Sequence, residues 1–189
     1  MNNHIEAVSY AFLCVIISIY FLSDCETTFM DRPVWPCPYG ESRLKNLYVT
    51  ESSGKWTSQS LFDAYSFTHI CHGIILFYVL YYIHGQQKYT YMIYIALAYE
   101  ILWEIIENSP MIINRYRAAS NISRNYAGDS IINSIGDIIS MSIGFFITWY
   151  FPQHGYKVLL VNELVLYYFI GDNLLTNVYQ IFFKTLQDS

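Results

Sequence analysis

The chain has 189 residues and a formal net charge of −5, and 54% of its residues are hydrophobic whereas only 13% are charged. A typical soluble domain is about 25% charged, so this composition favours a protein that places much of its surface in a lipid bilayer. Ten Lys and Arg residues scattered along an acidic chain form no basic stripe, which excludes nucleic-acid binding as the main activity. Four cysteines in this length also exclude a disulfide-stapled secreted miniprotein.

Hydrophobic runs predict an all-α fold in which the chain, 1–189, is one integral membrane helical bundle. A helix needs about 20 mostly apolar residues to cross the hydrocarbon. We therefore expect about five transmembrane helices, at 7–22, 64–83, 89–106, 130–151 and 156–180. The first has no basic flank and no small-residue cleavage site, so we expect an uncleaved span. The fifth is interrupted at 171–173, where we expect a kink rather than a separate interfacial helix.

One long loop, 23–63, separates the first two predicted spans and is rich in Pro, Ser and Gly. Loops of this length without secondary structure are uncommon and often functional. We expect it to fold over the membrane face as a lid. It contains Cys25 and Cys37, which are able to pair if the loop is exported to an oxidising compartment.

Ionisable residues recur at helical spacing inside the predicted spans, where each costs a few kcal/mol or more unless it is paired or functional. Residues three or four apart share a helix face. The sets are His69 and His72; Glu100, Glu104 and Glu107; Asp129, Asn133 and Asp137; and Asp172 and Asn173 at the break in the fifth span. Because antiparallel helices with short loops alternate in direction, we expect these faces to meet in one half of the bilayer, beneath the long loop.

The fourth predicted span also carries small residues at the spacing that lets helices approach closely. Gly136, Ser140 and Gly144 form a small-xxx-small ridge. This ridge lies beside the acidic face of the same helix, so the acidic face remains free to meet the histidines or glutamates.

Imidazoles and carboxylates converging at one depth are the usual ligands of zinc, and also of iron or manganese. The candidate metal ligands are His69, His72, Glu104 and Asp129. The candidate catalytic acid–base groups are Glu104, Glu107 and Asp137. The candidate substrate-binding residues are Arg115, Arg117, Asn108, Asp172 and Asn173, the arginines being placed to hold a phosphate.

These groups predict a metal-dependent hydrolase or transferase, with zinc or manganese as cofactor, acting on a lipid or lipid-linked substrate that enters from the bilayer. Two non-enzymatic alternatives remain open: a small transporter or ion-binding protein, and a structural membrane protein whose carboxylates form a network. A transporter usually shows repeated halves with matching broken helices, whereas this chain has one break and no repeat. Three Gly-Asp pairs are typical of intramembrane aspartyl proteases but lack the first Gly of that signature.

Several motifs carry a family resemblance. They are SFTHICHG (66–73), WEIIENSP (103–110), RYR (115–117), GDSIINSIGD (128–137) and GDN (171–173). In this order and spacing the chain, from about Arg32 to its end, resembles an uncharacterised bacterial multi-pass inner-membrane family known as a domain of unknown function. The family tends to have a His where Ser60 stands and a basic N-terminus, and this chain departs from it at both places.

The two available guides to orientation in the membrane disagree. The first and third loops hold seven Lys and Arg residues and the second and fourth hold two, so the positive-inside rule places the polar cluster in the cytoplasm. The resemblance implies the opposite orientation, because the relatives have a basic N-terminus and a basic second loop. We expect a protein of the cell inner (cytoplasmic) membrane with its polar face towards the periplasm. The sequence predicts no particular oligomeric state.

Overall fold

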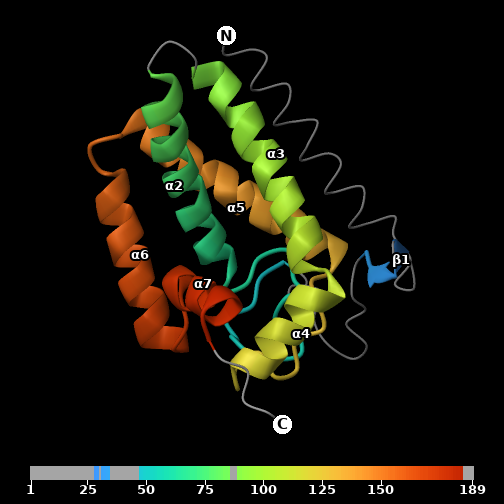
Figure 1. The fold of residues 1–189 in the computed structure, drawn as a ribbon. Helices are drawn as coiled ribbons and strands as arrows, with labels where there is room; N and C mark the ends of the chain where they lie inside the picture. Colours follow the sequence, from blue (N-terminus) through green and yellow to red (C-terminus); the bar gives the residue numbers. More distant parts are fainter. Residues whose placement is uncertain (1–27, 30, 35–46, 86–88, 185–189) are drawn as a thin grey trace.

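The computed structural model describes residues 28–29, 31–34, 47–85 and 89–184, and in this part the chain is mainly helical, as predicted (Figure 1). The helices are α2 (Ser66–His84), α3 (Tyr89–Glu107), α4 (Pro110–Ala119), α5 (Ile131–Tyr150), α6 (Gly155–Ile170) and α7 (Leu174–Phe182). Strands β1 (Thr28–Phe29) and β2 (Arg32–Pro33) form a short antiparallel pair. The predicted span at 7–22 and the cysteines Cys25 and Cys37 lie outside the described residues.

Two helices in the described part, α2 and α5, are long and apolar enough to cross a membrane. Helices α6 and α7 meet the same criterion only as a pair, bent by 75° at the break between them, which makes them either a broken span or a re-entrant loop. Helix α3 has the same 19-residue length as α2, but its second half carries Glu100, Glu104 and Glu107. The all-α bundle is thus confirmed, with two or three helices apolar enough to span.

Helices α2 and α5 make the most extensive contact in the bundle, and glycines on both helices allow it. A Cβ atom on Gly144 of α5 would lie 2.0 Å from the carbonyl oxygen of Ile70 in α2. A Cβ on Gly73 of α2 would lie 1.9 Å from the carbonyl oxygen of Met141 in α5. Backbones this close tolerate no side chain, so the close helix approach predicted from the small-residue ridge is confirmed at Gly144. Gly136, at the other end of the ridge, lies instead against the backbone of Leu61 in the loop before α2.

The bundle has an apolar half and a polar half. The main apolar cluster comes from the second halves of α2 and α5 and the first half of α3: Phe77, Leu80, Met92, Ala96, Met141 and Phe145. Because α3 runs antiparallel to α2 in this packing (Figure 1), the opposite ends of the same three helices meet at the other end of the bundle. These opposite ends carry the histidines and the acidic residues.

Two connecting segments close the polar half. The backbone N–H of Ser130, which caps α5, donates to the Ser58 carbonyl at 2.8 Å, so the described part of the long loop lies over the start of α5. The connection between α3 and α5 contains α4, a helix that the lengths of the apolar runs do not predict. It begins because Ser109 accepts from the backbone N–H of Ile112 and Pro110 occupies the first turn.

The turn between α6 and α7 is built from local capping groups. Gly171 takes a left-handed conformation, φ 72°, that ends α6. Asn173 and Thr176 then form a reciprocal capping box at the start of α7. At the other end of α7, Arg115 of α4 donates to the carbonyl oxygens of Ile181, at 2.8 Å, and Lys184. These contacts hold α7 against α4.

Candidate metal and acid–base site

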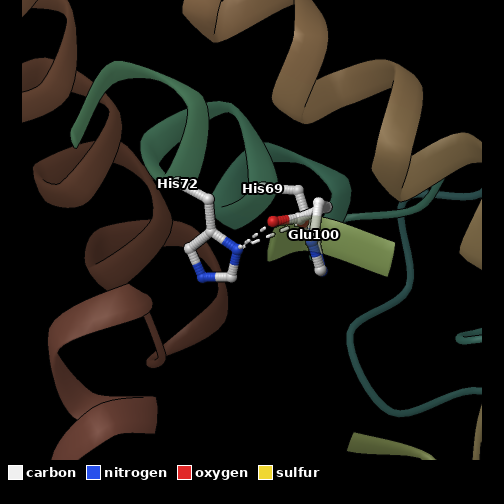
Figure 2. A group of neighbouring side chains, drawn as sticks. All are labelled: His69, His72 and Glu100. Atoms are coloured by element: carbon white, nitrogen blue, oxygen red, sulfur yellow. Dashed lines mark hydrogen bonds and ion pairs between the residues drawn. The ribbon is translucent and has the colours of Figure 1, made fainter. Parts of the chain in front are cut away.

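The centre of the polar half is His69, whose ring is oriented by a buried glutamate of α3. His69 Nδ1 lies 2.5 Å from Glu100 Oε1, and Glu100 is fully buried. His72, one turn further along α2, contacts both oxygens of the same carboxylate from its Nδ1 at 3.2 and 3.3 Å (Figure 2). A carboxylate that accepts from Nδ1–H fixes the histidine tautomer and leaves the Nε2 lone pair available for a ligand.

Asp137 of α5 faces this Nε2 atom. Its Oδ2 lies 3.8 Å from His69 Nε2, and its Oδ1 accepts a hydrogen bond of 2.9 Å from the hydroxyl of Ser66. Both Asp137 and Ser66 are buried. Ser66, at the start of α2, therefore orients Asp137 of α5 towards His69 of α2.

Glu104 completes the group, and its carboxylate is the strongest candidate for a metal ligand. Its Oε1 lies 3.6 Å from His69 Nδ1, and only 4% of the residue is exposed. Neither carboxylate oxygen has a hydrogen-bond partner among the residues that the structure describes. His69, Glu104 and Asp137 each offer one donor atom within 4.8 Å of the others. Three protein ligands of these types are typical of catalytic zinc sites.

A second set of potential ligands overlaps the first. His69, His72 and Glu100 also offer donor atoms within 4.8 Å of one another. In this set the Glu100 carboxylate already contacts both imidazoles, so its members partner each other without an ion. The first set contains Glu104, whose oxygens have no hydrogen-bond partner among the described residues, so this set is the better candidate for a metal.

Asp129 belongs to a separate hydrogen-bonded group. Its Oδ2 accepts from Asn108 Nδ2 and from the Tyr126 hydroxyl, both at 2.9 Å, while its backbone N–H donates to Asn108 Oδ1 at 2.6 Å. Burial, and then the charge of Asp129, raises the pKa of Tyr126 well above its usual range, so the phenol remains a donor. This group joins the end of α3 to the start of α5.

The other predicted substrate-binding residues hold the helices in place. Arg115 donates to backbone carbonyl groups at the end of α7, and Arg117 donates to the carbonyl oxygen of Tyr126. Asp172 and Asn173 lie at the turn before α7, where Asn173 is the helix cap. None of these four residues lines the cavities that adjoin His69.

Three cavities adjoin one another in a row through the polar half. The middle one, of about 50 Å³, is lined by His69, Glu107, Asp129 and Asp137 among others. It shares His69 and Glu107 with a cavity of about 240 Å³ that reaches α7. On the other side it shares Asp129 with a cavity of about 530 Å³ beneath the loop segments. Glu107 therefore lines the same cavity as His69 and Asp137.

Comparison with known proteins identifies the family. A family model described as "Protein of unknown function (DUF2585)" matches residues 27–185. The chain belongs to this family. It is 38% identical to a UPF0314 protein of Rhizobium meliloti over 146 residues, which cover 77% of this chain and 72% of the relative. A UPF0314 protein of Sphingopyxis alaskensis is 37% identical over 154 residues, with coverages of 79% and 78%. No solved structure matches the chain.

Family membership confirms the resemblance that the motifs carried, and the structure shows what Ser60 does in this DUF2585 protein. Ser60 is buried, its hydroxyl donates to the carbonyl oxygen of Trp56 at 3.2 Å, and its own carbonyl accepts from Asn133 Nδ2 at 2.7 Å. It lines none of the three cavities. In this chain position 60 therefore anchors the loop to α5.

Three residues of the site were missing from the candidates drawn from sequence. Glu100 shared the helical spacing of Glu104 and Glu107, and that spacing was a sufficient signal for including it. Ser66 lies three residues before His69 and so shares its face. Tyr126 lies in an irregular connection, where no periodic pattern indicates which way a side chain points.

Proposed function

We propose that this protein is a metal-dependent hydrolase or transferase of the cell inner membrane, with its polar cluster facing the periplasm, that acts on a lipid or lipid-linked substrate. The observation that carries the proposal is the Glu104 carboxylate, buried without a hydrogen-bond partner among the described residues, beside an oriented histidine. A buried carboxylate in this state costs several kcal/mol, and a divalent cation would remove that cost.

The proposed roles follow from the group of neighbouring donor atoms and from the middle cavity, which His69, Glu107 and Asp137 line. His69, Glu104 and Asp137 would hold a divalent ion such as zinc or manganese, which would supply an activated water at neutral pH. Glu100 and Ser66 would hold His69 and Asp137 in place by their hydrogen bonds. Glu107, which lines the same cavity, would take up and return the proton.

A second candidate function is an ion-binding or structural network without catalysis. It is favoured by the shared contact of His69 and His72 with Glu100, since that contact partners both imidazoles inside the protein. Under this alternative Glu104 would be protonated and no metal would be held.

The metal content of the purified protein distinguishes the two candidate functions. Purified protein, equilibrated with zinc or manganese and then dialysed, is expected to hold one ion per chain by elemental analysis. Glu104→Gln and His69→Ala should lose it. The matched control is Glu51→Gln, which removes the same charge from an exposed loop residue and should retain the ion. Circular dichroism checks that each variant keeps its helices.

The absence of bound metal from wild-type protein under all conditions would contradict the proposal and favour the network. Equal metal content in wild type and Glu104→Gln would contradict the ligand assignment.

A further inference from the structure

We propose, resting on the function proposed above, that the substrate is a membrane lipid bound across the three adjoining cavities. Its polar headgroup would lie in the 530 Å³ cavity beneath the loops, and one acyl chain would lie in the 240 Å³ cavity beside α7. The bond that reacts would then lie at the junction, next to His69, which lines both the middle and the α7 cavity.

The cavity beside α7 has the lining expected for a hydrocarbon chain. Its lining includes the two histidines and Glu107, and most of its other residues are apolar or aromatic side chains from several helices. The wall residues include Ile75, Leu76, Trp103, Val178, Ile181 and Phe182. Apolar walls with a few polar groups at one end are typical of sites that fix the orientation of a ligand.

The cavity beneath the loops is the more polar of the two. Many of its lining residues carry hydroxyl or amide groups, and its charged residues are two cations, Arg32 and Lys55, and two acids, Asp31 and Asp129. Its volume falls in the range of small-molecule sites, about 300–1,000 Å³. The middle cavity shares Tyr65, Tyr126 and Asp129 with it, so the polar lining continues up to the candidate metal ligands. Polarity therefore changes from one end of the row to the other as it does along a lipid.

The position of α7 connects the apolar cavity to the bilayer. One face of α7 contributes Val178, Ile181 and Phe182 to the cavity wall. Of these three, Ile181 is buried, whereas Val178 and Phe182 are partly exposed, as are Leu175 and Tyr179 of the same helix. In a broken span, as in a re-entrant loop, these exposed apolar side chains of α7 would face lipid. A chain leaving the cavity alongside α7 would therefore enter surrounding lipid rather than water.

Photocrosslinking in lipid nanodiscs tests the placement of the chain. The probe is a phosphatidylglycerol that carries a diazirine midway along one acyl chain, and its adducts are mapped by mass spectrometry. We expect adducts on the cavity wall, at Trp103 and Val178, in addition to the general labelling of the exposed α6 residues Leu164 and Tyr168.

Two blocking variants place a larger side chain in the cavity lining from two different helices: Val178→Trp from α7 and Ile75→Trp from α2. Each should lower the Trp103 adduct about tenfold relative to the α6 adducts, because exclusion of even two methylenes removes about this much affinity. The matched control is Leu175→Trp, which places the same ring on the exposed face of α7 and should change nothing.

Elemental analysis of the same preparations separates this inference from the proposed function. Metal bound in wild type and in Val178→Trp, with the Trp103 adduct lost only in the blocking variants, supports both. Two results would overturn the lipid placement alone while metal is still bound. In one, the adducts are confined to α6; in the other, neither blocking variant lowers the Trp103 adduct. Cavity adducts in a protein that holds no metal overturn the proposed function and leave the chain cavity standing as a lipid-binding site.

Discussion

Glu100 has the lowest exposure of the acidic residues around His69, and it contacts both histidines of α2. This position differs from that of Glu104, one turn further along α3, whose oxygens have no hydrogen-bond partner in the described part of the chain. Two chemically identical residues on one helix face are therefore expected to act differently. Glu104 would be a ligand, whereas Glu100 would orient the ligand His69.

The variant Glu100→Gln should weaken metal binding without abolishing it. Loss of an outer hydrogen-bonding partner typically lowers metal affinity about 10–100-fold. Competition with a chelator of known affinity should show this loss, while saturating metal should still give one ion per chain. Glu104→Gln serves as the comparison and should bind no ion at saturation. Identical behaviour of the two variants would contradict the division of roles.

At the scale of helices, the crossing of α2 and α5 positions the site. Gly144 lies against the carbonyl of Ile70, the residue that follows His69 in the chain. The opposing contact of Gly73 with Met141 fixes the same crossing from the other side. The distance between His69 on α2 and Asp137 on α5 therefore depends on the absence of side chains at these two glycines.

Gly144→Ala should destabilise the bundle and loosen the site together. The added methyl group meets backbone rather than a flexible side chain, so the helices must separate, at a cost of about 1–3 kcal/mol. Thermal unfolding in detergent should show a lower midpoint, and metal affinity should fall because His69 moves relative to Asp137. Ser142→Ala on the same helix is the control, because its hydroxyl bonds only to the Ile138 carbonyl within α5 among the described contacts. An unchanged midpoint in Gly144→Ala would show that the crossing is looser than the backbone distances indicate.

At the scale of the whole molecule, the polar cluster lies at one end of the bundle and the main apolar core at the other. Two segments distant in sequence, around Ser58 and Ser130, are hydrogen-bonded to each other at the polar end. Loops that meet at one end of a membrane bundle lie on the same side of the bilayer. The orientation of the entire protein therefore decides which compartment the candidate site faces.

Reporter fusions after Glu51, after Asn121 and at Gln86 determine this orientation. The first two should give the same signal as each other, and the fusion at Gln86 should give the opposite one. We expect alkaline phosphatase to be active at the first two sites, which places the polar cluster in the periplasm. Activity at Gln86 alone would place the cluster in the cytoplasm, as the count of Lys and Arg in the loops indicates.

The sequence by itself determined most of the helical segments, with α4 as the exception, and which polar residues share a face. Both follow from local periodicity, because residues three or four apart lie on one side of a helix whatever surrounds it. The alternation of helix direction then placed His69, Glu104 and Asp137 in the same half of the bundle. The stretch matched by the family model, 27–185, contains all three residues.

Only the tertiary structure decided which of these groups are partners. Sequence spacing gave Glu100, Glu104 and Asp129 similar standing, yet Glu100 contacts the histidines, Glu104 has no hydrogen-bond partner in the described part, and Asp129 bonds to Asn108 and Tyr126. The distances between helices depend on the glycine contacts of α2 with α5, which involve residues about 70 apart in the chain. A local pattern does not encode such distances. When two helices shift relative to each other, their side chains contact different partners, although each helix still presents the same residues on the same face.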